Sequence, residues 1–228
     1  MRSTGMPRAV LCLAAVVLAL AGDMRPCRGG PAPDFGRWEK DIAAFETKDT
    51  AAPPPRDAVL FAGSSSIRLW DLKTSFPGLD VINRGFGGSQ IADSTHFAPR
   101  IILKAEPRVI VFYAGDNDVA VGKTPGQVFD DFQDFAALIH KELPKTRIVF
   151  ISIKPSPARW DMVDKQRKAN GFVEAYCKKN DYLAYVNVAT PMLGEDGKPR
   201  QELFGKDGLH MNDKGYDLWA SLLKAYLK

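Results

Sequence analysis

The sequence predicts an α/β domain built on a parallel sheet with helices on both faces. Short runs rich in β-branched residues alternate with longer amphipathic segments from residue 57 onward, the order typical of strands joined by helical crossovers. The short runs are apolar without alternation, as expected of strands that are covered on both faces. The predicted strands are 58–62, 81–82, 109–113, 148–153 and 183–188.

Amphipathic segments predict the helices between these strands. Trp38, Ile42 and Phe45 recur at helical spacing in 34–48, and the Pro-rich stretch 51–56 ends that helix. Further predicted helices are 89–104, 125–142, 158–180 and 213–227. Ligands of such sheets bind at the carboxyl ends of the strands, so functional side chains are expected there.

The N-terminus has the pattern of a secretory signal peptide. Residues 1–8 are basic, 9–21 are apolar without interruption, and Ala19-Leu20-Ala21 offers a cleavage site. The apolar run is shorter than the roughly 20 residues that span a bilayer; an uncleaved anchor is the alternative. We therefore expect a secreted or periplasmic protein with no stable membrane insertion after cleavage. Residues 22–56 then form a leader and an N-terminal helix, and 57–228 form the main domain.

Charge and cysteine usage exclude several other classes. The net charge of +4 is spread along the chain without a long basic run, so nucleic-acid binding is not expected. Outside the signal peptide only Cys27 and Cys177 remain, and they either pair or stay free thiols. Neither belongs to a CxxC pair, so no zinc site is expected.

Chemically interesting residues follow four of the predicted strands. Gly63-Ser64-Ser65-Ser66 lies between a strand and a helix, where a serine is either an exposed nucleophile or a helix N-cap. The glycine-rich stretch 83–90 is either a tight turn or a loop that lets backbone approach a ligand.

The other two clusters carry an amide, carboxylates and an imidazole. Asn117 lies between Asp116 and Asp118, which suits a fixed N–H donor; a metal site on the two carboxylates is the competing interpretation. Asp207 and His210 are three residues apart on a glycine-containing turn, so the carboxylate can orient the imidazole as a base. Together the clusters supply the parts of serine acyl transfer.

In this order the clusters resemble the SGNH hydrolases, the GDSL-type esterase and lipase superfamily, from Phe61 to the C-terminus. The resemblance implies a flavodoxin-like, three-layer α/β/α domain with about five parallel strands. It further implies Ser65 as the nucleophile, with Asp207 and His210 completing a catalytic triad. The implied oxyanion hole consists of the N–H groups of Ser65 and Gly88 and the side-chain amide of Asn117.

One position departs from the family pattern. The family usually has aspartate before the nucleophile, and this chain has Ser64 there. Ser64 and Ser66 are therefore alternative nucleophiles, although the Phe-x-Gly-x-Ser spacing favours Ser65.

The substrate is expected to be a small-molecule or saccharide ester. Arg159 and Trp160 follow the fourth predicted strand and are candidates for substrate binding. No long apolar lid is evident, which favours short acyl esters, such as acetyl groups on carbohydrate, over long lipids. A lysophospholipase or thioesterase, a non-catalytic carbohydrate-binding module, and a metal- or nucleotide-dependent protein are the alternatives. No cofactor is expected.

Overall fold

The computed structural model describes Met1 and residues 34–227. The proposed signal peptide, the leader up to Pro33 and Cys27 lie outside the described residues. A compact unit begins at Asp34 and extends to the C-terminus.

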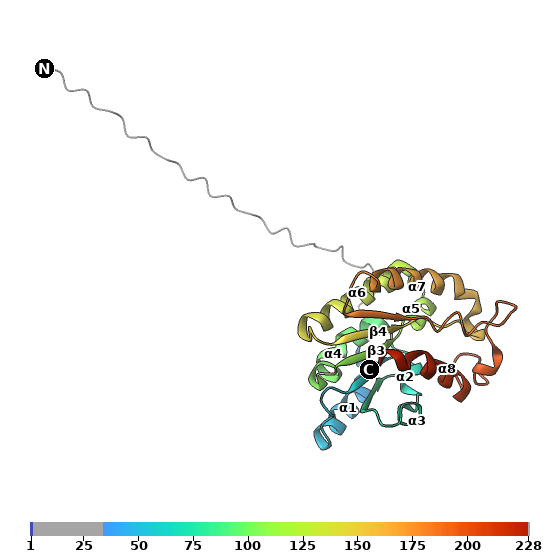
Figure 1. Ribbon diagram of the computed structural model, residues 1–228, viewed down its shortest axis with the longest axis horizontal. Coiled ribbons are helices and arrows are strands. Elements are labelled where there is room, and N and C mark those ends of the chain that lie inside the picture. Colours follow the sequence, from blue (N-terminus) through green and yellow to red (C-terminus); the bar gives the residue numbers. More distant parts are fainter. Residues whose placement is uncertain (2–33, 228) are drawn as a thin grey trace. The chain divides into compact units, whose positions relative to one another are not determined.

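The unit is built on a five-stranded sheet in which all strands are parallel, as predicted (Figure 1). The strand order is β2-β1-β3-β4-β5, the flavodoxin-like order, whose direction reverses between β1 and β3. The strands are β1 (Val59–Gly63), β2 (Val81–Gly85), β3 (Val109–Tyr113), β4 (Arg147–Ile151) and β5 (Leu183–Val186).

Alternate strand residues face two separate apolar cores. Leu60 and Ala62 pack with Trp38, Ile42 and the apolar side chains of helices that cover one face of the sheet. Val59 and Phe61 pack instead with side chains of helices on the other face. The first set comprises α1 (Glu39–Ala51), α4 (Ile91–Ile101), α6 (Pro125–Glu142) and α7 (Val163–Cys177), and the second α2 (Ser65–Arg68), α3 (Leu72–Ser75) and α8 (Asp213–Leu223).

Short elements complete the domain. They are α5 (Asp116–Ala120), η1 (Gly36–Trp38), η2 (Leu103–Ala105), η3 (Pro157–Met162), η4 (Gln201–Leu203) and η5 (Lys224–Tyr226). The predicted helix 158–180 was wrong as one element, because its first part is the 3₁₀ element η3, inside which Arg159 has non-helical φ −131° and ψ 28°, and α7 begins only at Val163. The predicted helix 125–142 has the bounds of α6, where Thr124 and Gln127 form a capping box.

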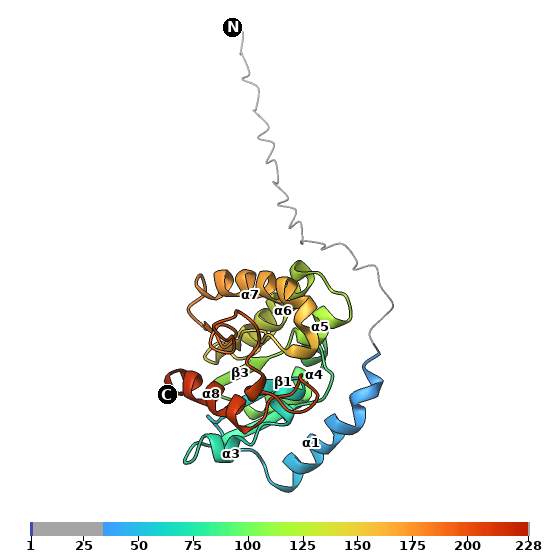
Figure 2. The same cartoon turned by 90° about the vertical axis from the view of Figure 1, so that its right-hand side faces the viewer.

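The N-terminal helix α1 lies along the outside of the domain (Figure 2). Both apolar and charged side chains hold it there. Trp38 and Ile42 are buried. Arg84, whose side chain is only 4% exposed, contacts the Asp49 carboxylate at 2.5 Å and donates to the Ile101 carbonyl at 3.0 Å. This ion pair joins α1 to β2, the strand that leads into the glycine-rich loop.

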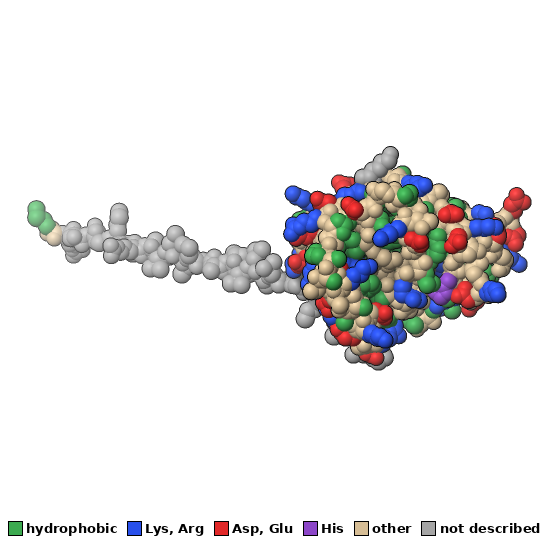
Figure 3. All heavy atoms as spheres, turned by 90° about the horizontal axis from the view of Figure 1, so that it is seen from below, with side chains coloured by type: hydrophobic (Ala, Val, Ile, Leu, Met, Phe, Trp, Pro, Cys, Tyr) green, Lys and Arg blue, Asp and Glu red, His purple; other side chains and the backbone are tan. Residues whose placement is uncertain are grey.

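The surface carries charges of both signs. Figure 3 shows lysine and arginine interspersed with aspartate and glutamate on the face in view. Among the described residues, no helix is both long and apolar enough to cross a membrane.

Candidate active site

The four predicted clusters meet at the carboxyl edge of the sheet. The last residue of β1, Gly63, aligns with Gly85 of β2 and with Tyr113 of β3. Ser65, Gly88 and Asn117 follow these aligned positions by a few residues and therefore lie on neighbouring loops. The site falls where the strand order reverses, as is usual for ligand sites of open α/β sheets.

Two glycines let the first loop turn sharply between β1 and α2. Gly63 has φ +130°, and a Cβ there would lie 1.9 Å from the Tyr113 carbonyl oxygen. A Cβ on Gly85 would lie 2.2 Å from the Arg68 nitrogen, so α2 packs directly on the end of β2. Ser65 is thereby the first residue of α2, and its N–H has no acceptor within the helix.

Ser65 and its two serine neighbours differ in exposure. Ser64 and Ser66 are buried at 2% and 3% exposure, whereas Ser65 is half-buried. The Ser64 N–H donates to the Tyr113 carbonyl at 3.0 Å. Of the three serines, Ser65 is the one whose hydroxyl contacts the histidine.

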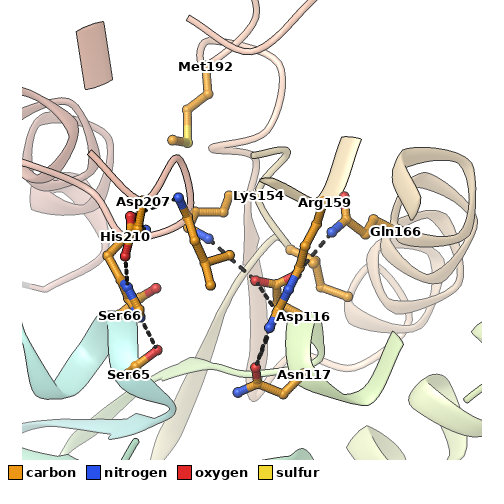
Figure 4. A network of polar contacts seen from close by, with 12 residues as sticks. Ser65, Ser66, Asp116, Asn117, Lys154, Arg159, Gln166, Met192, Asp207 and His210 are labelled. Carbon is orange, nitrogen blue, oxygen red and sulfur yellow. Dashed lines mark hydrogen bonds and ion pairs between the residues drawn. The ribbon is translucent and has the colours of Figure 1, made fainter. Parts of the chain in front are cut away.

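Ser65, His210 and Asp207 form one continuous chain of hydrogen bonds (Figure 4). The Ser65 Oγ lies 3.0 Å from His210 Nε2, and His210 Nδ1 lies 2.6 Å from Asp207 Oδ2. Asp207 Oδ1 also accepts from the N–H groups of Leu209 and His210, both at 3.0 Å. The imidazole contact and these N–H donors lower the pKa of Asp207 to about 2.

Backbone hydrogen bonds hold the loop that carries Asp207 and His210. The Gly205 N–H donates to the His210 carbonyl at 2.8 Å, and the Ala158 N–H donates to the Gly208 carbonyl at 3.0 Å. Gly208 has φ +61°, a conformation that favours glycine. The second bond ties the histidine loop to the segment after β4.

The glycine-rich loop and the loop after β3 are also joined. The Asn117 Nδ2 donates to the Ser89 carbonyl at 3.0 Å, which occupies one of its two hydrogens. Gly88 has φ +74° and is exposed. No backbone carbonyl of the described residues accepts from its N–H.

The Arg159 guanidinium contacts two consecutive side chains of α5, those of Asp116 and Asn117. Its two Nη atoms each lie 3.2 Å from Asn117 Oδ1, and Nη1 lies 2.9 Å from Asp116 Oδ2. The Arg159 side chain is 19% exposed. Trp160, the other expected substrate-binding residue, is half-buried, with the Arg167 guanidinium 5.7 Å from its ring centroid.

Sequence reasoning missed Lys154 and Gln166, which complete the surroundings of Asp116. The Lys154 Nζ lies 3.4 Å from Asp116 Oδ2, and Gln166 Nε2 donates to Asp116 Oδ1 at 3.0 Å. Lys154 is 1% exposed, and burial lowers its pKa. A lysine shortly after a buried strand was the available signal, because such a position lies at the same edge of the sheet.

The carboxylates of the Asp-Asn-Asp turn point in different directions. Asp118 is fully buried, contacts Lys123 Nζ at 2.8 Å and accepts from the Ile91 N–H at 3.3 Å. Asp118 thus holds the start of α4, while Asp116 faces Arg159. Within the described residues, no group of three or more His, Cys, Asp or Glu side chains is arranged to hold a metal ion.

The fold is that of open, doubly wound α/β proteins, and sequence comparison identifies the family. Residues 63–218 match the model of the GDSL-like lipase/acylhydrolase family. The chain therefore belongs to this family, as the sequence predicted. No match was found among curated proteins.

Solved structures share the fold at low sequence identity. A GDSL-like lipase from Bacteroides thetaiotaomicron is 24% identical with a TM-score of 0.71, over 85% of this chain and 98% of that one. A protein from Streptococcus pneumonia is 20% identical with a TM-score of 0.76, over 85% and 94%. A carbohydrate esterase family 3 protein from Talaromyces cellulolyticus is 16% identical with a TM-score of 0.59, over 75% and 95%.

Proposed function

We propose that the protein is a serine ester hydrolase that works through an acyl-enzyme. The observation that carries the proposal is the hydrogen-bonded chain from Ser65 through His210 to Asp207. Ser65 Oγ attacks the ester carbonyl while His210 Nε2 takes its proton, and the same proton then goes to the leaving alcohol. Water repeats the sequence on the acyl-enzyme and releases the acid.

Asp207 orients the imidazole and stabilises its charged form. Its carboxylate faces Nδ1, which leaves Nε2 directed at Ser65. Because the pKa of Asp207 is lowered to about 2, the carboxylate is ionised throughout the neutral range. It therefore opposes the positive charge that the imidazole acquires in the transition state.

Three donors supply the proposed oxyanion hole. They are the N–H of Ser65, the N–H of Gly88 and the second Nδ2 hydrogen of Asn117. Arg159 contributes indirectly, since its bonds to Asn117 Oδ1 fix which end of the amide faces Ser89 and the substrate. Donors held in place before the reaction stabilise the developing negative charge without reorganisation.

The proposed substrates are short acyl esters, acetyl groups on saccharides in particular. Ser65 is only half-buried and His210 retains 32% side-chain exposure, so a bulky alcohol can approach from solvent. Among proteins of the same fold are the Talaromyces carbohydrate esterase and an acetyl esterase mutant with an acetate ion. We further propose that residues 1–21 direct secretion, which N-terminal sequencing of the exported protein tests.

Hydrolysis of p-nitrophenyl esters of increasing acyl length tests the proposal. Ser65→Ala is compared with Ser64→Ala and Ser66→Ala, which make the same change at adjacent positions. We expect turnover on short esters, its loss by several orders of magnitude in Ser65→Ala only, and preference for acetate. Preference for long chains points to a lysophospholipase or thioesterase instead. Saccharide binding by a folded chain without turnover points to a binding module.

A further inference from the structure

We propose that Trp38, on the segment that precedes the sheet, positions the Gly88 N–H for its role in the oxyanion hole. The inference rests on the proposed hydrolase function. Trp38 lies outside residues 63–218, the range that matches the family model. Its partner is the glycine-rich loop, 49 residues further along the chain.

One rigid peptide unit joins the Gly87 carbonyl to the Gly88 N–H. The Trp38 indole Nε1 donates to the Gly87 carbonyl at 2.9 Å. This peptide is trans, and in a planar trans peptide the C=O and the following N–H point in opposite directions. The indole therefore fixes the direction of the Gly88 N–H by holding the opposite end of the same rigid plane.

The need for such a hold follows from the residues themselves. Two consecutive glycines have wide conformational freedom, and a Cβ at Gly88 would meet nothing within 4 Å. Side-chain packing at Gly88 thus cannot set the orientation of the peptide. A hydrogen bond from a rigid, buried donor can.

The four carbonyls from Phe86 to Ser89 each accept a hydrogen bond from a side chain. The Phe86 carbonyl lies 2.9 Å from the Ser89 hydroxyl, and the Gly88 carbonyl accepts from Arg37 Nη2 at 3.2 Å. The Ser89 carbonyl accepts from Asn117 Nδ2 at 3.0 Å. With these four carbonyls engaged by side chains, and with no backbone carbonyl of the described residues accepting from it, the Gly88 N–H is left for a substrate oxygen.

Trp38 is itself fixed by its surroundings. It is 4% exposed, and its ring packs edge-on to Phe86 at 5.8 Å between centroids. The Arg37 guanidinium lies over the same ring, 3.6 Å from its centroid. Helix α1, which begins directly after Trp38, is anchored by Ile42 and by the Asp49–Arg84 pair.

The test separates the indole donor from the packing of the ring. Trp38→Phe keeps an aromatic ring and removes the donor. Trp38→His loses more apolar surface but keeps an N–H, because imidazole Nε2 occupies the topological position of indole Nε1. The matched control is Trp70→Phe, which removes a buried indole whose bond goes to Ser75 Oγ at 2.8 Å.

We expect Trp38→Phe to lower kcat on p-nitrophenyl acetate about three- to tenfold with little change in KM. Trp70→Phe stays within about twofold of the wild type. Trp38→His recovers part of kcat although it unfolds at a lower temperature than Trp38→Phe. Activity then follows the donor and stability follows the packing, a reversal that a merely structural role does not give.

A second readout is the amide resonance of Gly88. In Trp38→Phe, loss of the hydrogen bond at the Gly87 carbonyl should shift the Gly88 resonance, whereas in Trp70→Phe this resonance should stay unchanged. This comparison tests the inference even if Trp38→His does not fold. An unshifted resonance, or equal kcat in Trp38→Phe and Trp70→Phe with active wild type, overturns this inference alone. A wild type without Ser65-dependent hydrolysis overturns the proposed function as well.

Discussion

Replacing Arg159 distinguishes a residue that holds Asn117 from one that binds substrate. In Arg159→Ala the Asn117 amide loses both donors to Oδ1 and keeps only the bond from Nδ2 to the Ser89 carbonyl. Asp116 retains Lys154 and Gln166, so the fold is expected to persist. The freed amide can rotate and spends less time with its donor in the oxyanion position.

The size of the effect is bounded from two sides. Hydrogen bonds to a charged group contribute about 1.5–3 kcal/mol, and these two are long and partly exposed, which favours the lower value. Complete loss of one oxyanion donor costs about 10²–10³ in kcat, so Asn117→Ala sets the ceiling. We expect Arg159→Ala to lower kcat about 10- to 30-fold, near 1.4–2 kcal/mol, with little change in KM.

The assay is steady-state hydrolysis of p-nitrophenyl acetate in a double-mutant cycle. If Arg159 acts through Asn117, the double variant Arg159→Ala/Asn117→Ala is no slower than Asn117→Ala alone. Additive losses, or a loss confined to KM, refute this reasoning. Those results favour direct contact with the substrate, which the sequence suggested for Arg159.

The remaining predictions concern charge, stability and thiol reactivity. Asp207→Asn should lower kcat on p-nitrophenyl acetate by about 10⁴, because the imidazole loses the carboxylate that orients it. Since the pKa of Asp207 is lowered to about 2, its ionised carboxylate stabilises the fold above about pH 4. Urea unfolding at a series of pH values should show that this stabilisation is lost between about pH 4 and pH 2 in the wild type, whereas Asp207→Asn lacks this loss. Asp49→Asn should lower the free energy of unfolding, measured in urea, by about 3 kcal/mol, because it leaves the Arg84 guanidinium buried without its carboxylate. Glu106→Gln, in an exposed pair with Arg56, should lower it by at most about 1 kcal/mol. Equal losses in the two variants would contradict the argument from burial. Burial raises the pKa of Cys177 to about 12, so its thiol should resist a thiol reagent at pH 8 in the native protein and react once the chain is unfolded without reductant.

The sheet was predictable because its strands are buried on both faces. Continuous apolar runs such as Val109–Tyr113 leave little ambiguity when long amphipathic segments separate them. The second strand was harder, since only Val81 and Ile82 are apolar. Asn83 and Arg84 belong to it because their backbones pair with β1, and their polar side chains find partners beyond the sheet. The non-helical backbone at Arg159 could not be predicted because arginine is a good helix former, and its contacts with Asp116 and Asn117 arise only in the fold.

The candidate site was predictable to the extent that residue type indicates chemistry. A serine and an amide at strand ends, together with an Asp-x-x-His turn before the last helix, indicate acyl transfer by their functional groups. The supporting residues were not, because Lys154 and Trp38 resemble ordinary core or loop positions in the sequence. Their roles depend on which carbonyl or carboxylate the fold brings within hydrogen-bond distance.

The most direct test of the central hypothesis is to find which atom becomes acylated. The intact protein is treated with a fluorophosphonate, and the digest is mapped by mass spectrometry. The account predicts one adduct on Ser65, absent in Ser65→Ala and strongly slowed in His210→Ala. Labelling of Ser64 or Ser66, or none in a folded wild-type protein, would contradict it.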